Sequence, residues 1–153
     1  MNGYTQLLRY LKQLGDQDIF INTVTKGEFE LVDIAKKNIF PLMHVKVGNA
    51  NFPANSVVQF DVQIGVFDIR DISKEIITDT YWGQDNEDDN LNECLYSINR
   101  IWQLMLIDFE ENDMIASQNP TLEQFISKHE NLLDGWIMTF TVDVPNININ
   151  LCQ

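Results

Sequence analysis

Acidic side chains spaced by two residues give the first hint of chemistry in this 153-residue sequence. Asp85, Glu87 and Asp89 imitate the opening of a calcium-binding loop, in which oxygen ligands occupy alternate positions. Such a loop requires glycine at its sixth position and glutamate at its twelfth, but Asn90 and Tyr96 stand there. The segment is therefore predicted to be a solvated acidic loop and not a calcium site.

The histidines and cysteines are too scattered to suggest a metal site or a nucleophilic centre. His44 and His129 lie in different predicted elements and have no histidine or cysteine at ligand spacing. His44 lies within an apolar run and is predicted to be a hydrogen-bonded structural residue, whereas Cys94 is predicted to be a small buried hydrophobic one. Because Cys94 and Cys152 are the only cysteines, a disulfide scaffold and a multi-cysteine zinc site are excluded, and reducing surroundings are favoured.

Other catalytic signatures are missing from the sequence. It contains no G-x-S-x-G string, and its seven glycines are too dispersed to form a phosphate-binding loop. With 23 acidic residues in the chain, no single carboxylate pair points to acid–base catalysis. The sequence therefore predicts neither an enzyme nor a bound cofactor.

Composition limits the classes of protein that remain. A hydrophobic fraction of 44 % is enough to bury a core, and the length fits a single domain over residues 1–153. Ten basic against 23 acidic residues give a formal net charge of −13, which disfavours sequence-specific binding to a nucleic acid. The start of the chain lacks a leader pattern and no apolar run approaches a membrane span, so we expect a protein that is neither exported nor membrane-bound.

Hydrophobic periodicity predicts the elements that position these side chains. Apolar residues three and four apart indicate helices over residues 4–14, ended by Gly15, and 91–107, capped by Asn90. Branched and aromatic residues ended by a turn signal indicate a strand over residues 18–25, and alternating patterns indicate strands over residues 39–47, 56–69 and 136–144. Residues 122–130 fit either an extended or a helical segment. The order predicts an α+β domain, with an antiparallel or mixed sheet built on a long β-hairpin and packed by two main helices.

Two surface segments stand out for contacts with other molecules. A loop of six to eight residues is predicted at the hairpin tip, where Asn51, Phe52 and Pro53 are candidate subunit contacts with Phe52 as an aromatic anchor. The alternative is that Phe52 folds back on its own sheet. Residues 39–47 carry apolar side chains on both faces, which one small domain is not expected to cover alone.

The second segment runs from Asp79 to Glu93, is acidic and contains no lysine or arginine. It is predicted to form a negative surface that faces a DNA channel or meets a basic partner. Its candidate residues are Asp79, Asp85, Glu87, Asp88 and Asp89.

Several strings in the chain resemble a known group of proteins. They are Ile39–Val45, Val57–Asp68, Asp85–Leu91, Asn131–Trp136, Val144–Asn146 and the final Cys152. Over about residues 4 to 152 the chain resembles small neck and tail proteins of tailed bacteriophages, especially phages of Bacteroides and the crAss-like phages. The fold of those proteins is similar to tail terminators and head–tail connector rings.

This resemblance implies a structural virion protein of the phage neck or tail. It implies a ring of six or twelve subunits around the DNA conduit, assembled in the host cytoplasm beside other neck, tail or portal-associated proteins. It implies no catalytic residue.

Two other functions remain open from the sequence alone. A small acidic regulatory protein could bind its partner as a monomer or dimer and mimic DNA through the acidic segment. A metal-dependent hydrolase could use Asp85, Glu87 and Asp89. The solution mass separates the first rival from a ring, and metal dependence of an activity would indicate the second.

Overall fold

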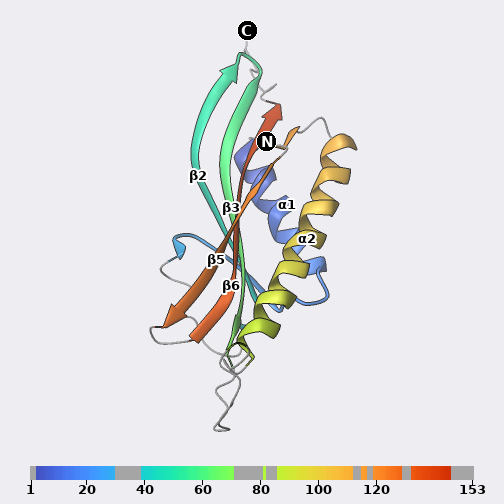
Figure 1. Cartoon of the computed structure of the whole chain (residues 1–153). Coiled ribbons are helices and arrows are strands. Elements are labelled where there is room, and N and C mark those ends of the chain that lie inside the picture. Colours follow the sequence, from blue (N-terminus) through green and yellow to red (C-terminus); the bar gives the residue numbers. More distant parts are fainter. Residues whose placement is uncertain are drawn as a thin grey trace.

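The computed structural model describes residues 3–29, 39–70, 81, 86–111, 115–116, 119–128 and 132–145. The elements follow the chain in the order α1 (Gly3–Gln17), β1 (Thr23–Lys26), β2 (Leu42–Ala54), β3 (Val57–Ile69), α2 (Glu87–Glu111), β4 (Ile115–Ala116), β5 (Thr121–Lys128) and β6 (Leu132–Pro145). Both helices lie on one side of a single sheet, and the β2–β3 hairpin rises above the helices toward one end (Figure 1). The predicted α+β fold is confirmed.

The sheet is mixed and its strands are arranged β1–β2–β3–β6, with β4 and β5 beside β6. β1 runs parallel to β2 over four residue pairs, and the other pairings are antiparallel. β3 pairs with β6 from Val57 to Ile69, so β4 and β5 share the remaining edge of β6. The undecided segment 122–130 is therefore extended as far as Lys128, because residues 121–128 find paired backbone groups on β6. Residues 129 and 130 lie outside the described residues.

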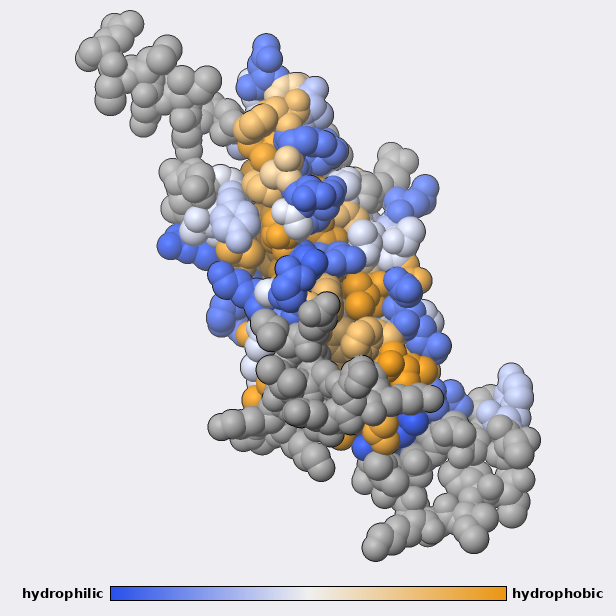
Figure 2. Space-filling view, turned by 90° about the vertical axis from the view of Figure 1, so that its left-hand side faces the viewer, coloured by the Kyte–Doolittle hydropathy of each residue, from blue (hydrophilic) through white to orange (hydrophobic). Residues whose placement is uncertain are grey.

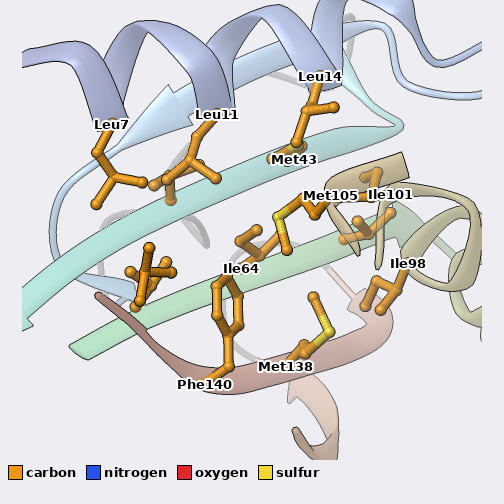
Figure 3. Packing of buried hydrophobic residues seen from close by; sticks show 14 of the residues in the cluster. Leu7, Leu11, Leu14, Met43, Ile64, Ile98, Ile101, Met105, Met138 and Phe140 are labelled. Atoms are coloured by element: carbon orange, nitrogen blue, oxygen red, sulfur yellow. The ribbon is translucent and has the colours of Figure 1, made fainter. Parts of the chain in front are cut away.

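The main core lies between the helices and the inward-facing rows of the sheet. Side chains spaced by three and four residues on each helix meet every second residue of the central strands (Figure 3). The labelled members of this cluster are Leu7, Leu11, Leu14, Met43, Ile64, Ile98, Ile101, Met105, Met138 and Phe140. Fully burying one such side chain stabilises the fold by about 1.5–3 kcal/mol, so this layer supplies most of the driving force for folding.

A smaller cluster covers the lower part of the opposite sheet face. Leu42, Phe67 and Leu133 are buried there, with Phe29 and Phe125 packed against them. All four residues from Leu42 to Val45 are consequently buried, although their side chains alternate between the two faces. The expectation that one domain could not cover both faces is wrong for this part of β2.

The upper part of that face is polar. Its side chains include Lys46, Asp61, Gln63 and Thr139, which line an open hollow of about 800 Å³. Figure 2 shows this side of the molecule, with hydrophilic residues across its middle and hydrophobic residues also on the raised hairpin end. The helices therefore cover one face below the raised end of the hairpin, and the chain covers the other face only in part.

Gly15 does not end the first helix as predicted. It lies inside α1 and is buried, and a Cβ atom there would come within 2.4 Å of Val24 Cγ2 and 2.8 Å of the Met43 sulfur. Glycine at this position allows the helix to approach the sheet closely, and α1 continues to Gln17.

The first strand is shorter than the predicted 18–25. The side chain of Asp18 accepts the backbone N–H of Phe20 at 2.9 Å, which makes a local turn. The same carboxylate binds Arg100 through two hydrogen bonds of 3.0 Å and accepts one from Ser97 at 3.2 Å. Residues 18–22 are thus held against α2, and regular strand geometry begins at Thr23.

Candidate functional site

The long hairpin is the most distinctive surface that the chain builds. β2 and β3 have 13 residues each and are joined by a two-residue turn at Asn55 and Ser56. The predicted loop of six to eight residues is wrong, because residues 48–54 continue β2 and pair with β3. Every residue from Gly48 to Ser56 is exposed. The hairpin therefore projects as a two-stranded arm, not as a loose loop.

Two irregularities bend this arm. Between the pairs Val47↔Val62 and Ala50↔Phe60, β2 contains one more residue than β3, and the same occurs between Asn51↔Gln59 and Ala54↔Val57. These are β-bulges, which increase the local twist and redirect side chains. No alternation rule predicts them, because the bulged residues break the period of two.

The candidate contact residues Asn51, Phe52 and Pro53 all lie on this arm and are exposed. The Phe52 side chain is 75 % exposed, so the alternative in which it folds back on its own sheet is wrong. Residues 48–56 carry no charged side chain. The arm therefore offers an uncharged surface with one accessible aromatic ring, which is a suitable anchor for a protein contact.

The outer edge of the arm is open. β1 pairs only with Leu42–Val45, and β3 occupies the other side of β2. Among the described strands, none pairs with the outer edge of β2 from Lys46 to Ala54. Backbone N–H and C=O groups at such an edge can pair with a strand from another chain, although bulges and proline limit this pairing.

The acidic candidates are divided by the structure. Asp79 and Asp85 lie outside the described residues. Glu87, Asp88 and Asp89 form the first turn of α2 and not an exposed loop, since the helix begins four residues earlier than predicted. Carboxylates in this position interact favourably with the positive end of the helix dipole, which explains why the acidic stretch can be helical.

Glu87 differs from its neighbours because it turns toward the protein. Its carboxylate lies 3.4 Å from the Arg70 guanidinium, and the Arg70 side chain is only 8 % exposed. Asp88 and Asp89 are exposed. The acidic surface predicted from the sequence therefore retains these two side chains among the described residues, while Glu87 belongs to an internal contact.

Sequence analysis missed a buried polar network at the same end of α2. Arg70 donates to both carboxylate oxygens of Asp134, at 2.6 and 3.2 Å, and Asp134 is completely buried. Asn90 is not a helix cap but lies buried within α2, where its amide donates to the Ile69 carbonyl at 3.1 Å and to Asp134 at 3.3 Å. The sequence pattern gave no signal for this network, because Asp134 precedes the strand predicted over residues 136–144, and only the structure shows that β6 begins at Leu132.

His44 is the structural histidine that the sequence predicts. Nδ1 lies 2.7 Å from the Thr25 hydroxyl, and Nε2 lies 2.9 and 3.1 Å from the carbonyls of Gly27 and Glu28. Because carbonyls only accept, Nε2 carries the proton and Nδ1 accepts from Thr25. Burial lowers the pKa of His44 below its ordinary value of 6.5, against the opposite effect of the carbonyls. A neutral, fully bonded ring is poorly suited to acid–base catalysis.

The remaining groups do not form a reactive centre within the part of the chain that is described. Cys94 is buried as predicted, and burial raises the pKa of its thiol, which makes it a weak nucleophile. The described residues contain no group of three or more histidine, cysteine or acidic side chains that could hold a metal ion. His129 lies outside the described residues.

Comparison with known proteins adds no relative. No protein-family model matches the chain, and no curated protein matches its sequence significantly. Among the described helices, neither is long and apolar enough to cross a membrane. The candidate functional surface therefore rests on the geometry of the hairpin and its edge.

Proposed function

We propose that this chain is a structural protein that assembles into a ring in the neck or tail of a bacteriophage. The observation that carries the proposal is the exposed arm formed by Lys46–Ala54, with an unpaired outer edge among the described strands and an accessible Phe52 ring. An edge on one side of a subunit that binds a different surface of the next is a heterologous contact, and such contacts close into rings when the rotation fits. The resemblance to phage neck and tail proteins supports the same reading.

The charge of the chain suits a ring around DNA. A net charge of −13 gives a surface that does not neutralise phosphates, so a duplex passing through would slide without being gripped. Asp88 and Asp89 are exposed at the start of α2 and are candidates for the lumen, together with Asp79 and Asp85. In this proposal the protein performs no catalysis and binds no cofactor.

The test is the solution mass of the purified chain across a range of concentrations, measured by native mass spectrometry and sedimentation. A closed multimer of six or twelve copies is expected. Phe52→Ala should weaken assembly while preserving the thermal unfolding temperature of the subunit. The Phe52 side chain is exposed, so its removal takes no buried contact from the fold. Ile19→Ala is a matched control, since Ile19 is 92 % exposed but lies on the turn after α1.

Two outcomes would contradict the proposal. One is a strictly monomeric chain that is also absent from purified virions. The other is that Phe52→Ala assembles like the wild type, which would show that the arm does not form the subunit contact. A monomer or dimer that competes with DNA for a basic protein would instead support the acidic regulatory function.

A further inference from the structure

An apolar pocket lies between α2 and β5, and we call it the α2–β5 pocket. Its volume is about 330 Å³. Its lining includes the cross-strand partners Leu122 and Met138, together with Leu95, Tyr96 and Trp102 from α2. Tyr96 and Leu122 are 58 % and 44 % exposed, and Leu95 and Trp102 are half-buried. Exposed apolar side chains gathered in this way mark a site of contact with another molecule.

The α2–β5 pocket has the size and the walls to hold an aromatic ring. A cavity of about 150 Å³ is enough to bind benzene, so a pocket of about 330 Å³ has room for a phenyl group. The Trp102 indole packs edge-on against Phe140, with ring centroids 5.5 Å apart, and this contact holds one wall in place. Tyr96 and Trp102 would add ring–ring contacts to an aromatic group bound beside them.

Charge favours a second copy of this chain as the partner. With a net charge of −13, two copies repel each other wherever their acidic surfaces meet. Among the described residues that line the pocket none is charged, and residues 48–56 of the arm carry no charge either. These two surfaces can therefore meet without burying an unpaired ion. Phe52, 75 % exposed, is the only aromatic residue in residues 46–56.

The topology makes this a contact between copies and not within one chain. β3 and β6 lie between β2 and β5 in the sheet, so Phe52 does not reach the pocket of its own subunit. The cross-strand pairs place Thr121 level with Lys46, and Phe52 lies roughly 20 Å further along β2 at about 3.3 Å per residue. The arm of one copy would therefore meet the pocket of the next if the strands are inclined to the ring axis, as they are by about 35–45° in closed barrels.

We propose that Phe52 of one copy fills the α2–β5 pocket of the next copy. The inference rests on the proposed ring and names the surface that receives the arm. The bulges of β2 and Pro53 limit a regular backbone ladder at the open edge, so the Phe52 side chain is the main anchor. Each copy then binds one neighbour with its arm and the other with its pocket, and such contacts close into a ring when the rotation fits.

The decisive experiment mixes an arm variant with a pocket variant. Phe52→Ala removes the anchor, and Leu122→Asp places a charge at the pocket. Each variant alone should raise the dissociation constant of assembly by about tenfold or more, measured by sedimentation. At a concentration where both variants are monomeric, an equimolar mixture should form a heterodimer and stop there. The intact arm of one variant enters the intact pocket of the other, and the two remaining surfaces are defective.

Leu104→Asp is the matched control for the pocket variant. Leu104 is also 44 % exposed and lies on α2, but it is not among the described residues that line the pocket. Because it adds the same charge, Leu104→Asp should assemble like the wild type. Thermal unfolding checks that each variant is folded.

Photocrosslinking provides a readout that does not depend on the folding of a pocket variant. The chain is made with p-benzoylphenylalanine in place of Phe52 and is irradiated at a concentration where the wild type assembles. Crosslinks between copies should map to residues that line the pocket, such as Tyr96 and Leu122.

The outcomes separate this inference from the proposed function. A wild-type ring whose Leu122→Asp variant assembles normally, a mixture without a heterodimer, or crosslinks to any other surface overturns the pocket contact and leaves the ring intact. A wild-type chain that stays monomeric at every concentration overturns both.

Discussion

His44 shows how one buried residue ties a turn to the sheet. Its ring bonds link β2 to Thr25 on β1 and to the backbone at Gly27 and Glu28. Gly27 has a φ of 124°, which side chains other than glycine rarely adopt, and this conformation brings its carbonyl to the imidazole. The sequence predicted a hydrogen-bonded histidine from its apolar surroundings. It could not predict the partners, because they depend on how the chain turns after β1.

Protonation of His44 should destabilise the fold at mildly acidic pH. Since burial lowers the pKa of the native ring below 6.5, the unfolded chain binds the proton more readily. The stabilising contribution is complete above about pH 6.5 and is lost as the pH falls toward the native pKa. Urea unfolding at about pH 7.5 and 5.5 should show a larger loss for the wild type than for His44→Gln. Equal losses in both proteins would contradict the role of His44.

Gly135 should be the least replaceable glycine among those described. A Cβ atom there would lie 2.0 Å from the Val66 carbonyl oxygen and 2.9 Å from the Phe67 Cα, both backbone atoms that cannot move independently. Gly135→Ala should lower the free energy of unfolding by about 3 kcal/mol or more. Gly48→Ala is the matched control, since its Cβ would meet only the Asp61 carbonyl at 3.8 Å and should cost less than about 1 kcal/mol. Chemical denaturation measures both, and similar losses would refute the close-packing argument.

At the scale of elements, α2 shows where sequence patterns succeed and where they fail. The apolar spacing of Leu91, Leu95, Ile98, Trp102 and Met105 predicted the helix, and Leu91, Ile98 and Met105 are buried. Leu95 and Trp102 are only partly buried, because the centre of the buried face runs through Cys94 and Ile101. The predicted cap at Asn90 is wrong because a tertiary contact claims that side chain. The helix begins earlier, at Glu87, where acidic residues favour a helix start. Local patterns do not reveal which polar residue a distant strand will bind.

The Arg70–Asp134 pair should be the most sensitive ion pair among those described. It joins the end of β3 to β6 beside the start of α2, and the side chains are 8 % and 0 % exposed. Asp134→Asn would leave a buried guanidinium without its main carboxylate and should cost about 3–5 kcal/mol. The free energy of unfolding from denaturant titration measures this loss.

Asp16→Asn is the control for this pair. It removes the exposed Lys12–Asp16 pair on α1, whose side chains are 66 % and 52 % exposed, and should change stability by less than about 0.5 kcal/mol. A small loss in Asp134→Asn would mean that the nearby Glu87 replaces the missing carboxylate.

At the scale of the molecule, the strand order of the sheet is set partly by pairing between strands that are distant in sequence, such as β3 and β6. Alternation predicted the β2–β3 hairpin and most of β6, because their inward rows are continuous. Alternation did not predict that β5 would pair with β6. Most of the described side chains of β5 face solvent, so β5 lacks an alternating pattern of apolar and polar residues. The bulged, exposed arm was not predicted for the same reason. Alternation of apolar and polar residues arises where one face of a strand is buried, and the burial of β2 ends near Val47.

The net charge of the whole chain should make its stability depend on salt. A formal charge of −13 on a compact chain opposes folding by self-repulsion. The exposed pairs Lys12–Asp16 and Lys46–Glu28 offset little of this repulsion, because exposed ion pairs contribute about 0–1 kcal/mol each. Raising the ionic strength shortens the screening length and should therefore stabilise the folded chain.

Thermal unfolding of the dilute, monomeric protein can test this effect. Between about 0.02 and 0.5 M sodium chloride the unfolding temperature should rise by about 2–4 °C, which corresponds to about 1 kcal/mol for a chain of this size. Potassium chloride should produce the same shift, since screening depends on ionic strength and not on the identity of the cation. A fall in the unfolding temperature would mean that attractive ion pairs outweigh the net repulsion. A rise only with one cation would point instead to specific ion binding by the acidic surface.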